Sequence, residues 1–131
     1  MSIVGPVPIS IHGALAELSL LSDRSPTTSA EQAKDAFSML AVCQSGGVFV
    51  GYWAGASEWE RHNAGDEIVM VADGETTIYF LVDNDERPAT LGVGDLVIVP
   101  QGVWHRFETA VGVKLMSITP QPTDHAAQRP I

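Results

Sequence analysis

Residues 57–67 of the chain read "SEWERHNAGDE", a short stretch that is dense in charged side chains and holds a turn signal near its end. Successive side chains of a β-strand point to opposite faces, so Glu58, Glu60 and His62 share one face. The tryptophan and the arginine between them lie on the other face. Burying carboxylates without a partner costs several kcal/mol per ion. The polar face is therefore expected to meet water or a cation.

The turn "NAGD" separates His62 from Glu67, which opens the next strand. A hairpin places the residues that flank its turn side by side. His62 and Glu67 can therefore reach a common atom, and they form a candidate pair of ligands.

A second stretch, "GVGDLVIVPQGVWHRFET" at residues 92–109, holds another histidine after a rigid turn. Its apolar run stops at Pro100, because proline cannot donate a hydrogen bond to a strand ladder. Gly102 permits a tight bend, and His105 begins the next strand beside apolar neighbours. His105 is therefore a candidate ligand on a well-held backbone.

The two stretches together resemble the two sequence motifs of the cupin superfamily. The first motif reads Gly-x5-His-x-His-x3–4-Glu-x6-Gly, and the second reads Gly-x5-Pro-x-Gly-x2-His-x3-Asn. The residues of this chain that match these motifs are His62, Glu67, Gly74, Gly94, Pro100, Gly102 and His105. The resemblance implies an all-β fold, a single-domain cupin jelly-roll β-barrel (double-stranded β-helix) with an N-terminal arm.

Three positions depart from the cupin motifs. Glu60 stands where the first motif has its first histidine, and Ala54 stands where it has its leading glycine. Thr109 stands where the second motif has its closing asparagine. The change at Glu60 matters most, because it alters the set of groups that could hold a metal ion.

The resemblance also implies a divalent metal ion inside the barrel. The implied ligands are Glu60, His62, Glu67 and His105. Two carboxylates and two imidazoles suit Mn²⁺, Fe²⁺, Zn²⁺ or Ni²⁺. Two alternatives stay open for Glu60: it binds the ion directly, or it orients a histidine ligand from outside.

Short β-type runs separated by turn signals fill the chain from residue 36 onward, which is typical of an all-β sandwich or barrel. We expect an arm with a short helical segment that packs on the barrel (residues 1–35), the barrel itself (36–120) and a frayed tail (121–131). Within the barrel, "DNDERP" (83–88) and "VGV" (111–113) are expected to be turns between strands.

Two features of the N-terminal segment predict local structure and assembly. Ser29 and Gln32 have the spacing of a capping box, which predicts one helical turn there. Residues 2–11 are extended and partly apolar, and a strand of this kind can pair with an open sheet edge. Cupins commonly dimerise in this manner, so we expect a homodimer.

Charge and cysteine content narrow the partners and the compartment. The chain has sixteen acidic and seven basic residues among 131, and its formal net charge is −9. This charge repels a nucleic-acid backbone or an anionic membrane, so neither is an expected partner. Cys43 is the single cysteine and fits a reducing compartment. The first residues read as neither a signal peptide nor a membrane span, so we expect a cytoplasmic protein.

Two classes of function fit these features. The first is a small metal-dependent enzyme, such as a dioxygenase, isomerase or lyase, that acts on a small organic molecule. The second is a non-catalytic module that binds a small ligand or a metal ion. No separate general base can be named. Lys114 is the only candidate cation from the barrel strands, and this scarcity of cations favours a neutral or metal-chelating ligand. Glu58 is expected to be solvated, and His125 is expected to be structural or incidental.

Overall fold

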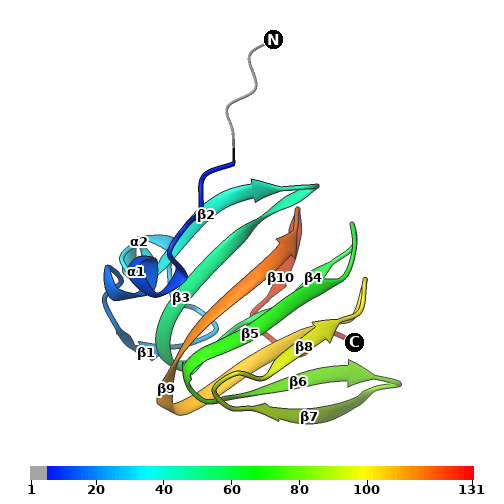
Figure 1. Cartoon of the computed structure of the whole chain (residues 1–131). Helices are drawn as coiled ribbons and strands as arrows, with labels where there is room; N and C mark the ends of the chain where they lie inside the picture. Colours follow the sequence, from blue (N-terminus) through cyan, green and yellow to red (C-terminus); the bar gives the residue numbers. More distant parts are fainter. Residues whose placement is uncertain (1–5) are drawn as a thin grey trace.

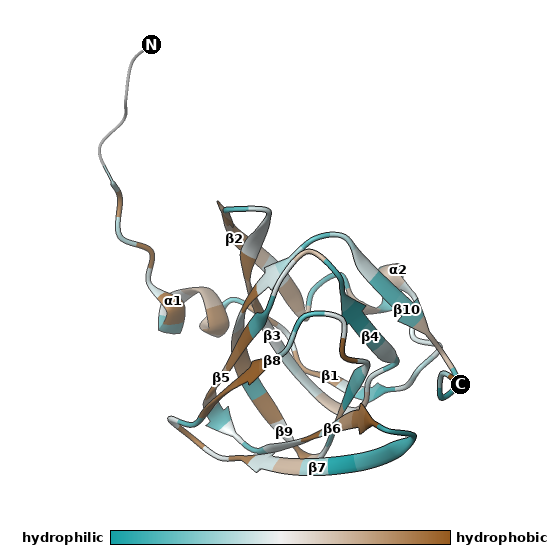
Figure 2. Cartoon of the chain, turned by 90° about the vertical axis from the view of Figure 1, so that its right-hand side faces the viewer, coloured by the Kyte–Doolittle hydropathy of each residue, from teal (hydrophilic) through white to brown (hydrophobic). Residues whose placement is uncertain are grey.

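The computed structural model describes residues 6–131, which form a sheet of ten strands and two short helices (Figure 1). The helices are α1 (Ile11–Ala16) and α2 (Ala30–Ala33). The strands are β1 (Leu21–Arg24), β2 (Phe37–Cys43), β3 (Gly46–Ala56), β4 (Trp59–His62), β5 (Glu67–Gly74), β6 (Thr76–Val82), β7 (Asp85–Leu91), β8 (Leu96–Val99), β9 (His105–Pro120) and β10 (Thr123–Ala126). The strands curl around a shared interior (Figure 2), so the all-β prediction is confirmed. Within these residues, no helix is long and apolar enough to cross a membrane.

The long strand β9 joins the two layers of the barrel. Its residues 113–120 pair with β3 and β5, and its residues 105–109 pair with β4, β6 and the end of β3. Between these parts the strand bends at Gly112, where φ is 106°. A Cβ at Gly74 would lie 2.2 Å from the carbonyl oxygen of Gly112, so two backbones meet closely at this corner. The expected turn at 111–113 is therefore wrong: it is a bend within one strand, because ladder partners continue on both sides.

The expected turn at residues 83–88 is also wrong, because most of that segment belongs to β7. β7 pairs with β6 along its whole length, and the turn between them holds only Asp83 and Asn84. Both residues have positive φ, at 52° and 66°, as a two-residue hairpin turn requires. The sequence "DERPATL" hides the strand, since its charged residues and Pro88 are tolerated on an edge strand that faces solvent.

Residues 123–126 are not frayed, which corrects the expectation for the C-terminal tail. They form β10, which pairs antiparallel with β4. Asp124 accepts hydrogen bonds from the guanidinium of Arg61 at 2.8 and 3.1 Å and from the Asn63 amide at 2.8 Å. The strand is held by a backbone ladder and polar contacts rather than by apolar burial, so hydrophobic patterning does not reveal it.

The N-terminal segment contributes a strand to the sheet. The predicted capping box is confirmed: the Ser29 hydroxyl accepts from the Gln32 backbone, and the Gln32 side chain accepts from the Ser29 backbone. β1 then runs parallel to β3. Residues 2–5 of the expected dimerisation arm (2–11) lie outside the described residues, and α1 begins at Ile11.

Buried apolar side chains and buried polar side chains occupy the same interior. The apolar cluster consists of Trp53, Val69, Val71, Ile78, Leu91, Val99, Phe107, Val113 and Leu115. His62, Glu67 and His105 are buried as well, at 2%, 5% and 0% exposure. Buried ionisable groups of this kind require partners, and their contacts are described below.

We predict that Gly55→Ala will destabilise the fold more than Gly94→Ala. Gly55 pairs with Arg24 of β1 at φ 114°, and an added Cβ would lie 2.2 Å from the Arg24 carbonyl oxygen. Gly94 has φ 87° and nothing within 4 Å of an added Cβ, so it isolates the conformational cost of about 1–2 kcal/mol. Urea denaturation should show a clearly larger loss for Gly55→Ala. Equal losses would mean that β1 does not constrain this position.

Candidate metal centre

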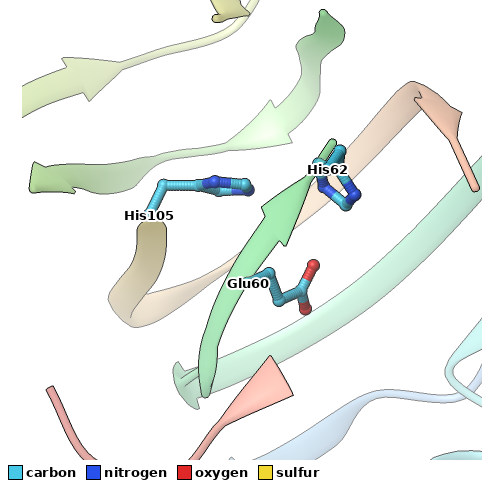
Figure 3. A group of neighbouring side chains, drawn as sticks. All are labelled: Glu60, His62 and His105. Atoms are coloured by element: carbon cyan, nitrogen blue, oxygen red, sulfur yellow. The ribbon is translucent and has the colours of Figure 1, made fainter. Parts of the chain in front are cut away.

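The four residues predicted to hold a metal ion come together in space. Glu60 and His62 lie two residues apart on β4, Glu67 is the first residue of β5, and His105 is the first residue of β9. Glu60 and His105 are direct cross-strand partners. Figure 3 shows Glu60, His62 and His105 around a common space, and ligand atoms of these three lie within 4.8 Å of one another.

Glu67 lies between the two imidazoles. Its Oε1 is 3.2 Å from Nε2 of His105, and its Oε2 is 3.4 Å from Nε2 of His62. The two histidine rings are 5.2 Å apart between centroids. A carboxylate and two imidazoles from three strands therefore present their polar atoms to one another in a buried place.

Outer hydrogen bonds fix the orientation of these three side chains. Nδ1 of His105 donates to the carbonyl oxygen of Val103 at 3.1 Å, which leaves Nε2 facing the centre. Nδ1 of His62 is 3.0 Å from the hydroxyl of Thr123 on β10. The hydroxyl of Thr119 donates to Oε2 of Glu67 at 2.6 Å. Contacts of this kind hold ligand side chains in position in metal sites.

Three buried atoms at the centre make no well-aligned hydrogen bond within residues 6–131, although ion-pair contacts of 3.2 and 3.4 Å join Glu67 to the two imidazoles. The three atoms are Nε2 of His62, Oε1 of Glu67 and Nε2 of His105. More than nine in ten buried polar groups in proteins are hydrogen-bonded, so three such atoms in one place call for an explanation. Imidazole nitrogens with a carboxylate oxygen are donors that divalent transition metals accept, so this set fits such an ion.

The protonation states of the site are shifted by burial and by neighbouring charges. Burial alone would raise the pKa of Glu67, but the adjacent imidazoles of His105 and His62 outweigh it and lower that pKa to about 2. Burial would lower the pKa of His105, yet Glu67 raises it. Burial and the charge of Glu67 raise the pKa of Glu60. The metal-free centre thus favours an ionised Glu67 beside a protonated imidazole.

Glu60 differs from the other three residues because it has a cationic partner. Its side chain is 20% exposed, and its Oε1 lies 3.8 Å from a guanidinium nitrogen of Arg24 on β1. The guanidinium carbon of Arg24 is 4.9 Å from the Phe37 ring centroid and 4.5 Å from that of Trp53. Arg24 therefore lies against two aromatic rings beside the candidate centre.

Sequence reasoning missed Arg24 and chose Lys114 as the cation of the cavity, which is wrong. Lys114 lies over the ring of Tyr52 at 4.7 Å and is absent from the cavity lining. The local pattern around Arg24 carries no signal of its position. Its place beside Trp53 follows from the parallel pairing of β1 with β3, which spans about thirty residues of sequence.

A cavity of about 620 Å³ opens beside Glu60 and Glu67. Its apolar wall includes Phe37, Phe49, Trp53, Val69, Phe107 and Leu115. Glu58, which we expected to be solvated, and His125, which we expected to be incidental, both line it. Oε1 of Glu58 and Nδ1 of His125 are 2.7 Å apart. The size and the mixed lining suit a small organic molecule.

The opposite face of β4 holds packing contacts, as the alternation of its side chains predicts. The guanidinium carbon of Arg61 is 4.6 Å from the Trp104 ring centroid. That of Arg106 is 5.5 Å from the Trp59 ring centroid. Both arginines also bind carboxylates on that face, so they are not available to the cavity.

Known proteins with similar sequences include dioxygenases. The chain is 33% identical over 60 residues to acireductone dioxygenases from two strains of Rhodopseudomonas palustris, TIE-1 and ATCC BAA-98 / CGA009. The matched region covers 46% of this chain and 36% of each dioxygenase. The chain therefore spans little more than a third of the length of these relatives.

Solved structures and a family model agree on the fold. A cupin-2 domain protein from Shewanella frigidimarina superposes with a TM-score of 0.57 and 26% identity, over 66% of this chain and 80% of that one. A Neisseria meningitidis protein superposes with a TM-score of 0.64 and 17% identity, over 88% of this chain and 100% of that one. The family model described as "Cupin domain" matches residues 48–119, more than half of the chain. The chain thus belongs to the cupin family, and its barrel is the cupin jelly roll.

Proposed function

We propose that this cupin holds a divalent metal ion at Glu60, His62, Glu67 and His105 and acts on a small organic molecule in the adjacent cavity. The ion would be Mn²⁺, Fe²⁺, Zn²⁺ or Ni²⁺. The observation that carries the proposal is the convergence, within residues 6–131, of three buried donor atoms that face one another without a well-aligned hydrogen bond. The likeness to acireductone dioxygenases supports an oxygenase among the dioxygenase, isomerase and lyase reactions considered.

The residues of the chain have separable tasks in this proposal. A bound ion would act as a Lewis acid or as a redox centre. His62, Glu67 and His105 are buried and oriented by outer hydrogen bonds, so they form the rigid part of the site. Glu60 is more exposed and faces both the centre and Arg24, so its carboxylate is the ligand of the site that can change position most easily. The aromatic wall of the cavity would exclude water from a bound molecule.

A second candidate is a non-catalytic module that binds a small ligand without turnover. The close ion pairs between Glu67 and the two histidines favour it, because they let the polar groups compensate one another without a metal ion. Elemental analysis of the purified protein, followed by oxygen-consumption assays with diketones and catechols, separates the two candidates. A stoichiometric redox metal with turnover supports the enzyme, and absence of metal, even after reconstitution, supports the module.

We also propose a cytoplasmic homodimer. The single free cysteine fits a reducing compartment. Leu96 and Ile98 on β8 are 59% and 46% exposed, and Met39 and Val42 on β2 are 55% and 77% exposed. Apolar side chains on edge strands are typical of surfaces that pair with another chain.

Removing metal ligands should abolish metal-dependent stability. His105→Ala and Glu67→Gln should lose bound metal, because each removes one of the buried donor atoms, and Glu60→Gln should weaken retention by removing a charge. At a hundred-fold excess over Kd, the ion should raise the wild-type Tm by roughly 10 °C. Arg61→Gln, whose side chain binds Asp124 on the opposite face, serves as the matched control and should retain the metal. Metal content and Tm with each of the four ions check this, and an unchanged wild-type Tm would argue against the site.

The metal-free protein should be most stable at weakly acidic pH. The stabilisation from Glu67 is complete above its ordinary pKa of 4.5 and is lost as pH falls toward about 2. The stabilisation from protonated His105 is complete below its ordinary pKa of 6.5 and is lost as pH rises through its raised value. Zn²⁺ should preserve stability on the alkaline side, since binding requires deprotonated histidines. Melting curves of chelator-treated and zinc-loaded protein against pH measure this, and two parallel profiles would contradict it.

An Ile98→Glu substitution should convert the dimer to a monomer, because it places a charge on the exposed apolar edge of β8, which we propose to contact the second chain. Val111→Glu changes a side chain that is 73% exposed at the β9 corner and should leave the dimer intact. Sedimentation velocity at micromolar concentration gives the mass of each protein. A monomeric wild type would overturn the proposed assembly.

A further inference from the structure

Arg24 is placed at the cavity by elements that hold it firmly. It is the last residue of β1, and its backbone pairs with Gly55 of β3. Its side chain is 15% exposed, lines the cavity and lies against the rings of Phe37 and Trp53. Stacking on aromatic rings stabilises a guanidinium and restricts its plane. The charge is therefore presented to the cavity in a defined orientation.

The hydrogen-bonding capacity of this guanidinium is largely unused. Its ion pair within residues 6–131 is the one with Glu60, at 3.8 Å, which is too long for a hydrogen bond. Arg61 and Arg106 differ, because each donates hydrogen bonds to a carboxylate, at 2.8 Å from Arg61 to Asp124 and 3.1 Å from Arg106 to Glu86. A guanidinium carries five N–H donors. Arg24 thus keeps donors for a molecule in the cavity.

The carboxylates near Arg24 do not occupy its hydrogen-bond donors. The contact with Glu60 is 3.8 Å long, and Glu60 is also a candidate ligand of the metal ion. Glu58, the other acidic group that acts on Arg24, contacts Nδ1 of His125 at 2.7 Å. A ligand with an anionic oxygen could accept hydrogen bonds from the guanidinium, while its apolar part would meet the aromatic wall.

We propose that Arg24 determines ligand specificity by binding an anionic oxygen, either a carboxylate or an enolate, of a small organic acid in the cavity. The proposal rests on the metal-dependent function above, in which the ion supplies the second positive charge next to the ligand. It narrows the expectation of a neutral or metal-chelating ligand, which depended on Lys114 being the only candidate cation from the barrel strands. Two N–H groups of one guanidinium can bind a carboxylate in parallel, which a lysine cannot reproduce.

The test compares an acid with its uncharged isostere. Benzoate and benzamide are titrated by calorimetry into zinc-loaded wild type, Arg24→Gln and Arg24→Lys. Wild type should prefer benzoate, and Arg24→Gln should bind it about tenfold more weakly or worse, as expected from losing a hydrogen bond to a charged group. Arg24→Lys should fall between them, because it keeps the charge and loses the paired donors. Benzamide affinity should change little.

Lys114→Gln is the matched control, since Lys114 is also stacked on an aromatic ring but is absent from the cavity lining. It should bind benzoate as wild type does. Melting curves and zinc content of each variant show whether a loss of binding comes from unfolding or from loss of the metal. The Arg24→Lys variant keeps the test usable if Arg24→Gln fails to fold.

Two results would overturn the role of Arg24. One is equal benzoate affinity in wild type and a folded, zinc-loaded Arg24→Gln. The other is no preference for benzoate over benzamide in wild type, including no binding of either. If wild type holds no zinc, the same titrations on metal-free protein decide the question separately. An Arg24-dependent preference for benzoate would then support this proposal while the metal site fails.

Discussion

The pairing of β9 with four other strands is the constraint on which the rest of this molecule depends. One continuous strand of sixteen residues hydrogen-bonds to β3 and β5 in one layer and to β4 and β6 in the other. The bend at Gly112, where φ is 106°, makes this sharing geometrically feasible. The carbonyl oxygen of Gly112 lies so close to Gly74 that a Cβ at Gly74 would clash with it. Because His105 begins this strand opposite Glu60, the same ladder that closes the barrel also assembles the candidate centre.

The centre concentrates polar groups that a barrel interior would otherwise exclude. An ionised carboxylate and two imidazoles at almost zero exposure are costly unless they compensate one another or bind an ion. Here Val103, Thr119 and Thr123 already contact the outward-facing polar atoms of these side chains. The inward-facing atoms, within the part of the chain that the structure describes, have only ion-pair contacts with one another. Burying these groups lowers the stability of the fold, and in return the donor atoms are held rigidly in a fixed orientation. This arrangement is typical of a binding site and unusual for packing alone.

Two segments outside the barrel motifs shape what the cavity can bind. β1 brings Arg24 to the cavity from the N-terminal side, and β10 brings His125 and Thr123 from the C-terminal side. Both segments are short and lie far from the motifs in sequence, yet they add charge and hydrogen-bonding groups next to the centre. Cupin barrels host many functions, so differences of this kind, rather than the barrel, distinguish the chemistry of one family member from another.

The sequence by itself determined the family, the strand-rich fold and the residues that meet at the centre. It could do so because motif spacing and strand alternation are local: Glu60 and His62 share a face two residues apart, and one short turn brings Glu67 beside His62. Tertiary structure alone decided where β7 and β10 pair, how β9 bends, and that Arg24 rather than Lys114 enters the cavity. Those outcomes depend on hydrogen bonds and ion pairs between segments distant in sequence. The sequence of a polar edge strand cannot be told from that of a loop until the strand that pairs with it is known.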